Sequence, residues 1–157
     1  MLAALILISW ANGAPVVACL VLGRRWARPV DGGRRLGDGH LLLGRSKTWR
    51  GWAASVLTTP LVAEVLGLPW PLGLAVAVAA MLGDAAVSFL KRRLGLPSSA
   101  SVFLLDQIPE ALLPLLILRG PLALDSFEVL LVVLGFLVVN LVLTPAFRHL
   151  LSLRLWR

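Results

Sequence analysis

The sequence predicts an all-α integral membrane protein, a bundle of about five transmembrane helices, and three observations support this fold class. Apolar residues make up 59% of the 157 residues before the 14 glycines are counted, whereas soluble domains contain roughly 45–50% with glycine included. The apolar residues gather in blocks of about the length that crosses a bilayer. Nearly all Lys and Arg residues fall between these blocks. Because so small a domain cannot hide this much apolar surface from water, we expect lipid to be its solvent.

The apolar blocks define the expected helices. A spanning helix needs about 20 mostly apolar residues. Helices are expected because backbone polar groups inside lipid must be hydrogen-bonded within their own segment. The blocks lack the alternating polar residues that a membrane strand would need. We expect one domain, residues 1–157, with spans at residues 2–22, 51–68, 72–90, 102–118 and 127–147.

The positions of the basic residues predict how the chain is oriented. Segments 23–50 and 91–101 and the tail after the fifth block carry all Lys and Arg residues except Arg119. Since loops rich in Lys and Arg stay on the cytoplasmic side, we expect the N-terminus outside and the C-terminus inside. Segments 23–50 and 91–101 are then cytoplasmic loops of a multi-pass protein of the cell membrane.

Charge and cysteine content exclude several classes of protein. The formal net charge is +7, but the basic residues are confined to a few loops between apolar blocks. We therefore expect membrane lipids and phosphates as partners and no nucleic acid. The single cysteine, Cys19, cannot form an internal disulfide. These features exclude a soluble globular enzyme, a disordered chain and a disulfide scaffold.

Two carboxylates lie near the expected cytoplasmic boundary of the bilayer. Asp84 and Asp106 belong to different spans. Inserting an ionised group into a bilayer costs about 2.5–3.5 kcal/mol, so the ionised groups that a membrane protein does contain usually line a site. Mg²⁺ prefers one or two carboxylates together with phosphates, so one interpretation is a magnesium site held by both residues. In the alternative interpretation, Asp84 merely pairs with Lys91 or Arg92, which share its helical face.

The expected cytoplasmic loop 23–50 is long and rich in glycine. Long loops without regular structure of their own are usually functional, and glycine lets backbone amides approach a ligand closely. A solvated loop that follows the positive-inside rule explains the charges but not the glycines or the acids. We therefore expect this loop to bind a ligand, with Asp31 and Asp38 as candidate acids.

Polar residues also mark the start of the second span and the middle of the first. The N-terminus of a helix with flanking cations is an anion site, and this start carries hydroxyl groups, an ammonium and a guanidinium. In the first span, Asn12 precedes Pro15, so its side chain either satisfies backbone groups that the proline frees or reaches a ligand. The residues at the start of the second span are Ser46, Lys47, Thr48 and Arg50.

Four segments in this order are similar to those of a known family. They are Asn12-Gly13-Ala14-Pro15, Ser46-Lys47-Thr48-Trp49-Arg50-Gly51, Gly83-Asp84 followed by Ser88-Phe89 and Lys91-Arg92-Arg93, and Leu105-Asp106-Gln107. Together they resemble the CDP-archaeol synthases, and the resemblance extends over nearly the whole chain. The chain is more distantly similar to phosphatidate cytidylyltransferases. It lacks the His-Gly-Gly of their signature and has Asp106-Gln107 where those enzymes carry Asp-Arg, which favours the archaeal family.

The resemblance implies an activity and a set of site residues. The implied reaction is CTP plus 2,3-bis-(geranylgeranyl)glycerol 1-phosphate giving CDP-archaeol and pyrophosphate, with Mg²⁺ as cofactor and the active site facing the cytoplasm. CTP and an isoprenoid ether lipid phosphate would be the partners. Carried over residue by residue, the implied roles are metal binding for Asp84 and Asp106, phosphate contacts for Lys47, Arg50, Lys91 and Arg92, and substrate positioning for Asn12, Ser88 and Gln107.

The implied chemistry suits these residue types. A lipid phosphate is already an anion near neutral pH, so its attack on the α-phosphorus of CTP needs no general base. Two polyanions repel each other, so clustered cations and a metal are needed to bring them together. The alternatives are a phosphatidate cytidylyltransferase that acts on an ester lipid and, from a different class, a small membrane anion transporter.

Overall fold

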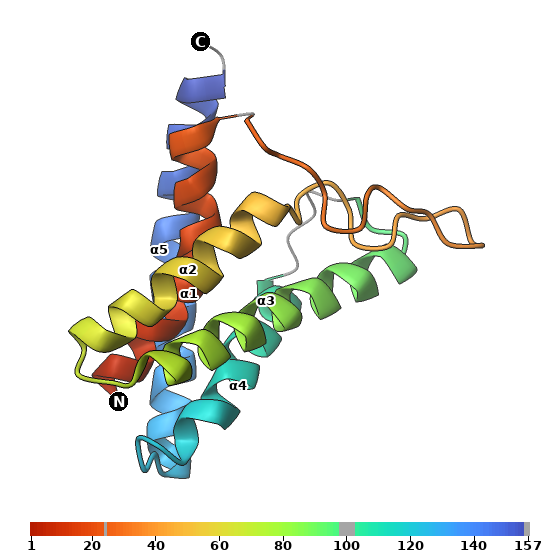
Figure 1. Ribbon diagram of the computed structural model, residues 1–157. Helices are drawn as coiled ribbons and strands as arrows, with labels where there is room; N and C mark the ends of the chain where they lie inside the picture. Colours follow the sequence, from red (N-terminus) through yellow and green to blue (C-terminus); the bar gives the residue numbers. More distant parts are fainter. Residues whose placement is uncertain (24, 98–102, 156–157) are drawn as a thin grey trace.

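The computed structural model describes residues 1–23, 25–97 and 103–155, and the side chains of 103–106, 144 and 146–155 are outside that description. The described residues form five α-helices (Figure 1). The five predicted helices are therefore confirmed as helices. Their bounds are α1 Leu2–Leu22, α2 Trp49–Val65, α3 Trp70–Arg93, α4 Phe103–Arg119 and α5 Ser126–Leu155.

Three helices end three or more residues away from the ends of the expected spans. The third was expected to end at residue 90 but continues to Arg93. The second helix was expected to run to residue 68 but ends at Val65, because Gly67 adopts a positive φ of 73° and Pro69 then becomes the N-cap of α3. The fifth was expected to end at 147 but continues to Leu155. Basic residues mark a lipid boundary, but they are good helix formers and do not end a helix.

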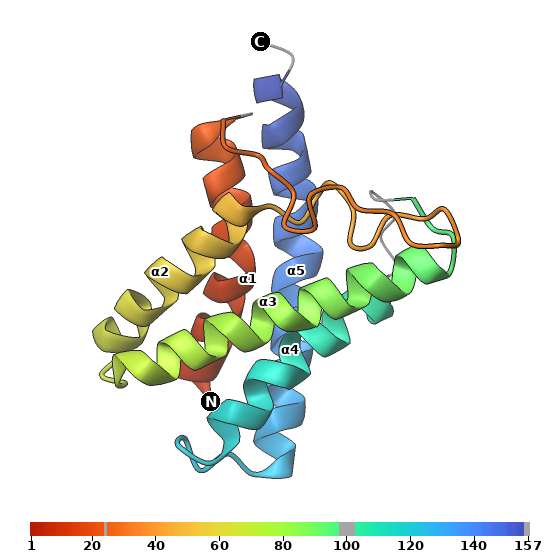
Figure 2. The same cartoon turned by 45° about the vertical axis from the view of Figure 1, so that its right-hand side comes forward.

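Three of the helices are long and apolar enough to cross a bilayer, within the part of the chain that was described. They are α1, α3 and the Ser126–Leu143 part of α5. Helices α2 and α4 have 17 residues each, slightly less than a typical span. The chain runs up and down, so α1, α3 and α5 end at the same end of the bundle, where the loop between α1 and α2 also lies (Figures 1 and 2).

Helix α1 is the centre of the bundle and contacts each of the other four helices. Its buried face consists of small and branched apolar residues, among them Ala4, Leu7, Ile8 and Ala11. These residues join one apolar core with side chains of the other helices, including Phe136 of α5. Figure 2 shows α3 crossing in front of α1 and α5, with α4 following α3 closely.

Glycines allow α3 to approach its neighbours. A Cβ built at Gly83 would lie 2.9 Å from the carbonyl oxygen of Pro109 in α4, which is closer than real Cβ atoms come. A Cβ at Gly73 would lie 2.8 Å from the Cα of Pro60 in α2. The backbones therefore meet directly at both crossings. The first crossing places the next residue of α3, Asp84, close to α4.

Side chains on neighbouring helices satisfy two carbonyl groups that prolines leave without a helical donor. Pro15 cannot donate to the carbonyl of Ala11, and the Ser55 hydroxyl of α2 donates to that oxygen at 2.8 Å. Pro114 likewise frees the carbonyl of Glu110 in α4, and the side-chain amide of Asn12 in α1 donates to that oxygen at 3.4 Å. These bonds are needed because an unpaired backbone group is costly away from water.

The Ser55→Ala variant is expected to lower the free energy of unfolding by about 1–3 kcal/mol, because it leaves the buried Ala11 carbonyl unsatisfied. Unfolding in mixed detergent micelles, followed by circular dichroism, measures this loss. Ser9→Ala is the matched control, since the Ser9 hydroxyl is buried and makes no hydrogen bond among the described residues. Equal stability of the two variants would contradict the role given to Ser55.

The loop between α1 and α2 has an ordered core built around Asp31. The buried Asp31 carboxylate accepts hydrogen bonds from the backbone amides of Gly33 at 2.9 Å, Leu43 at 2.8 Å and Gly44 at 3.2 Å. Burial raises the pKa of this carboxyl, but the three amide donors outweigh it, so the pKa lies below its ordinary value. Asp31, predicted as a candidate ligand-binding acid, thus has both oxygens engaged in folding the loop.

A second acid fixes the outer part of the loop to α3. Asp38 forms an ion pair with Arg93 in the last turn of α3 and accepts from the amide of His40 at 3.0 Å. The amide of His40 and the Arg93 guanidinium together lower the pKa of Asp38. Arg93 also donates to the carbonyl of Leu41 at 2.8 Å. Asp38 therefore holds the loop against α3.

The loop is expected to loosen in acid, and the sign follows from the lowered pKa of Asp31. Its ionised form is favoured by the folded loop, so the stabilisation is complete above the ordinary value of 3.8 and is lost as the pH falls through the lower folded value. Hydrogen exchange of the Leu43 and Gly44 amides measures this change. Asp31→Asn should exchange rapidly already at neutral pH, and unchanged protection in that variant would refute the role of Asp31.

Candidate functional site

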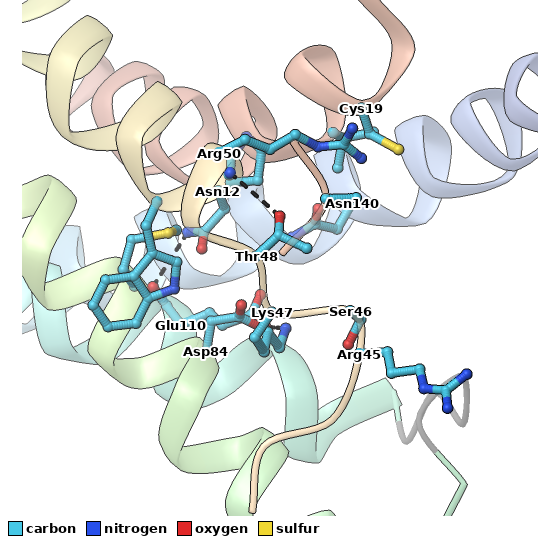
Figure 3. A pocket seen from close by; sticks show the side chains of 16 residues that line it. Asn12, Cys19, Arg45, Ser46, Lys47, Thr48, Arg50, Asp84, Glu110 and Asn140 are labelled. Atoms are coloured by element: carbon cyan, nitrogen blue, oxygen red, sulfur yellow. Dashed lines mark hydrogen bonds and ion pairs between the residues drawn. The ribbon is translucent and has the colours of Figure 1, made fainter. Parts of the chain in front are cut away.

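A cavity of about 540 Å³, lined by both polar and apolar residues, lies between the helices at the end where α2 begins. Its walls come from α1, the loop, the first turn of α2, two residues of α3, and one residue each of α4 and α5 (Figure 3). Apolar residues such as Val16 and Met81 complete the lining. The polar residues that line it are Asn12, Arg45, Ser46, Lys47, Thr48, Arg50, Asp84, Glu110 and Asn140.

The central contact of the cavity is an ion pair between Lys47 and Asp84, drawn in Figure 3. The side chains are largely buried, with 17% and 21% of their surfaces exposed. Asp84 was expected either to bind a metal or to pair with Lys91 or Arg92. The structure instead pairs it with Lys47, from the far end of the loop in sequence. A contact between residues 37 positions apart does not follow from helical spacing.

Two of the predicted anion-binding residues at the start of α2 also have structural roles. Thr48 is the N-cap of α2, and its hydroxyl accepts from the amide of Gly51 at 3.4 Å. Arg50 donates to the carbonyls of Gly23 at 2.5 Å and Arg25 at 2.7 Å, so it ties the end of α1 to the start of α2. Both residues still line the cavity, as Ser46 does.

Asn12 lines the cavity, but its side chain does not satisfy the carbonyl group that Pro15 frees in α1, which Ser55 satisfies instead. Its side-chain nitrogen donates to the carbonyl of Ile8 at 3.1 Å and to that of Glu110 at 3.4 Å. The second is the carbonyl that Pro114 frees in α4, whereas the prediction concerned the carbonyl freed by Pro15. Asn12 thus joins α1 to α4 beneath the cavity, and it lines the cavity as well.

Other predicted site residues do not line this cavity. Ser88, Lys91 and Arg92 lie on the inward face of α3 and are buried, with 3%, 8% and 5% of their surfaces exposed. They follow Asp84 by one to two helical turns, which carries them up to roughly 12 Å along the axis and past the cavity. Arg92 donates to the carbonyl of Pro97 at 2.8 Å, just beyond the end of α3.

The structure describes the side chain of only one of the two predicted site residues of the fourth span, Gln107. Asp106 belongs to the first turns of α4, but its side chain lies outside the described residues, so its metal-binding role stays a prediction. Gln107 is half-buried and does not line the cavity. Its side-chain oxygen Oε1 is buried and has no hydrogen-bond partner within the described part of the chain.

The cavity contains three polar residues that the sequence analysis did not choose. Glu110 and Asn140 come from α4 and α5, and Arg45 comes from the loop. The signal for the first two was present, since polar side chains inside apolar helices usually face a site or a neighbouring helix. Figure 3 shows Arg45 at the edge, with its guanidinium directed away from the other labelled side chains.

The donor groups of the cavity fit a hard divalent cation. Asp84 and Glu110 supply carboxylates, and Asn12 and Asn140 supply amides whose oxygens are hard donors. Among the residues that were described, no three or more His, Cys, Asp and Glu side chains lie together so that they alone could hold a metal ion. This composition suits Mg²⁺, which takes one or two carboxylates and completes its shell with water and substrate phosphates.

A bundle of apolar helices that encloses a cavity with a largely buried Lys47–Asp84 ion pair is a helical membrane protein. Residues 1–71 and 69–154 match the model of a family described as CarS-like, CDP-archaeol synthase. The chain belongs to the CDP-archaeol synthase family. The resemblance seen in its sequence motifs is thereby confirmed.

Individual relatives agree with this assignment. The chain is 38% identical over 104 residues to the CDP-archaeol synthase of Hyperthermus butylicus, an alignment that covers 62% of this chain and 59% of the relative. It is 39% identical over 145 residues to that of Halobacterium salinarum, covering 80% and 76%. The chain thus spans about three fifths of the first relative and three quarters of the second.

The fold is also similar to a solved structure. That protein is described as an intramembrane enzyme of archaeal membrane lipid biosynthesis. The TM-score is 0.73 at 32% sequence identity, and the match covers 90% of each chain. The helical membrane fold of this chain is therefore shared with a known membrane enzyme.

Proposed function

We propose that this protein is a CTP-dependent nucleotidyltransferase that forms CDP-archaeol. It would transfer CMP from CTP to the phosphate of 2,3-bis-(geranylgeranyl)glycerol 1-phosphate and release pyrophosphate. The observation that carries this proposal is the cavity in which Lys47 and Asp84 meet inside an apolar bundle. Membership in the CDP-archaeol synthase family supports the choice of CTP and of the ether lipid phosphate as substrates.

The main physical difficulty of this reaction is the repulsion between two phosphate-bearing substrates, and cationic side chains at the cavity reduce that repulsion. Lys47 and Arg45 belong to the same short loop segment, and both line the cavity. The Lys47 ammonium acts in a largely buried site, where electrostatic interactions are stronger than in water, whereas Arg45 is exposed at the edge of the cavity. We assign Lys47 to the phosphates of CTP, with the first turn of α2 as a further anion-favouring element.

Asp84, Asp106 and Glu110 are the acids that we assign to a Mg²⁺ ion. When bound, the ion would supply charge neutralisation for the two substrates and for the departing pyrophosphate. Asn12 of α1 and Asn140 of α5 contribute side-chain amide groups to the lining of the same cavity. No residue is needed as a general base, because the attacking lipid phosphate oxygen is already an anion.

We further propose that the chain crosses the membrane five times, with the N-terminus outside and the cavity open to the cytoplasm. The short helices α2 and α4 have 17 residues each, and a short apolar segment is accommodated by local thinning of the bilayer. In the sequence, all Lys and Arg residues but Arg119 lie in segments 23–50 and 91–101 and in the tail after the fifth apolar block. That asymmetry supports a cytoplasmic position for the end of the bundle that holds the loop between α1 and α2.

The test is a transfer assay with the purified full chain in detergent. Radiolabelled CTP is supplied with Mg²⁺ and either the isoprenoid ether lipid phosphate or an ester phosphatidate. The proposal predicts a labelled lipid product from the ether substrate. Product from the phosphatidate alone would identify the protein as an ester-lipid cytidylyltransferase, and no labelled lipid from either would refute the proposal.

A further inference from the structure

We propose that Lys47 is an exchangeable counter-ion: its ammonium holds the cation position at Asp84 until a divalent ion takes that position, and it then moves to the phosphates of the nucleotide. The proposal rests on the function proposed above and gives Lys47 two successive partners. It begins from the ion pair that these side chains form in the cavity. A carboxylate this far from water is costly unless a cation compensates it.

The backbone around Lys47 is held in place, so the exchange involves the side chain alone. The carbonyl of Lys47 accepts from the amide of Val30 at 2.8 Å, and its amide donates to the carbonyl of Gly44 at 3.3 Å. Thr48, the next residue, caps α2. The four-carbon stem of lysine is flexible and carries a compact charge with three donors. The ammonium can therefore leave Asp84 while the loop stays folded.

The cavity offers the space and the chemistry for the second position. Its volume of about 540 Å³ is space that no side chain of the described residues fills. Ser46 and Thr48, the sequence neighbours of Lys47, line the same cavity. A divalent ion and an ammonium cannot share one carboxylate without strong repulsion. Binding of the ion thus requires the ammonium to leave, and an arriving polyphosphate gives it a new anionic partner.

This exchange couples the two ligands of the site. A metal that binds without nucleotide must displace Lys47 and leave its charge unpaired, so its affinity is low. When a metal arrives with CTP, the pair of Lys47 with Asp84 is replaced by two pairs, one between the metal and Asp84 and one between Lys47 and the phosphates. Coupling of this kind between two ligands typically amounts to a factor of about 5–150. Removal of the ammonium should therefore strengthen the binding of the metal alone, although the same change weakens nucleotide binding.

The experiment measures Mn²⁺ affinity without nucleotide, by electron paramagnetic resonance of the free ion, on the full chain in detergent. Lys47→Met should bind Mn²⁺ about tenfold more tightly than the parent protein, and Lys47→Arg, which keeps the charge, should not. Arg45→Met is the matched control, because Arg45 comes from the same loop and lines the same cavity but is directed away from the other labelled side chains (Figure 3). It should change the affinity less than twofold.

Unchanged or weaker Mn²⁺ binding by Lys47→Met overturns the exchange, as does an equal gain in Arg45→Met, which would show a general charge effect. The transfer assay separates this from the proposed function. A parent protein that makes the lipid product while Lys47→Met shows no gain refutes the exchange alone. A gain without any product from the parent refutes the function but supports the exchange.

A second measurement avoids substitution. The sequence has two lysines, Lys47 and Lys91, so reductive ¹³C-methylation, which preserves the charge, labels few sites. Addition of Mg²⁺ with CTP should shift the Lys47 methyl resonance and leave that of the buried Lys91 in place. A Lys47 resonance that does not move when CTP is shown to be bound would overturn the proposal.

Discussion

Asp84→Asn is expected to reduce the rate of CTP-dependent lipid product formation by at least about a thousandfold. The amide is nearly the same size but carries no negative charge, so it cannot hold a divalent ion as a carboxylate does. Loss of one preorganised electrostatic group costs about a hundredfold to a thousandfold, and loss of the metal adds to this. The transfer assay with labelled CTP measures the change.

The control for this prediction is Glu64→Gln. Glu64 is an acid of α2 that is exposed and does not line the cavity. The Glu64→Gln variant should keep the activity of the parent protein. A comparable loss in both variants, or a modest loss in Asp84→Asn, would show that the carboxylate at position 84 has no special part in the reaction.

Lys47→Met is expected to lower kcat/KM for CTP by about a hundredfold to a thousandfold. The methionine keeps most of the apolar stem but removes the ammonium that we assign to the phosphates, and it leaves Asp84 without its partner. Initial rates over a range of CTP concentrations, at saturating lipid, measure the change. The loss should appear mainly as a higher KM, because the phosphates are bound both before and during transfer.

Lys47→Arg provides the comparison for this variant. Arginine keeps the charge in a different shape, so it should recover part of the activity and retain a lower KM than Lys47→Met. If the two variants were equally impaired, the shape of lysine and not its charge would be decisive. If neither lost activity, Lys47 would have no contact with the nucleotide.

The helices could be predicted from the sequence because lipid imposes a simple rule of apolar length. All five were found, and α1 has the predicted bounds. The errors arose at ends that depend on local backbone geometry. At the end of α2, the positive φ of Gly67 ends the helix before the apolar block ends.

The site was predictable only in part, because spacing along one helix says little about contacts between elements. Asn12, Lys47 and Asp84, which the sequence analysis names as site residues, line one cavity. Lys91 was expected at the phosphates from the family resemblance, but it does not line this cavity. The pairing of Lys47 with Asp84 depends on how the loop returns to α2, which the folded Asp31 core determines.

Asp31 also shows why acids in a glycine-rich loop are ambiguous in a sequence. The same carboxylate can bind a ligand or gather the backbone amides of its own loop. The structure resolves the question through three amide donors. Its functional contribution is therefore indirect, since it shapes the loop that presents Lys47.

The most direct test of the account is the binding of labelled CTP to the full chain in the presence of Mg²⁺, measured by equilibrium dialysis. We predict saturable binding by the parent protein and by Glu64→Gln, and binding weakened at least about a hundredfold in both Lys47→Met and Asp84→Asn. If both of these variants bound CTP as the parent does, the cavity would not be where nucleotide and cation meet.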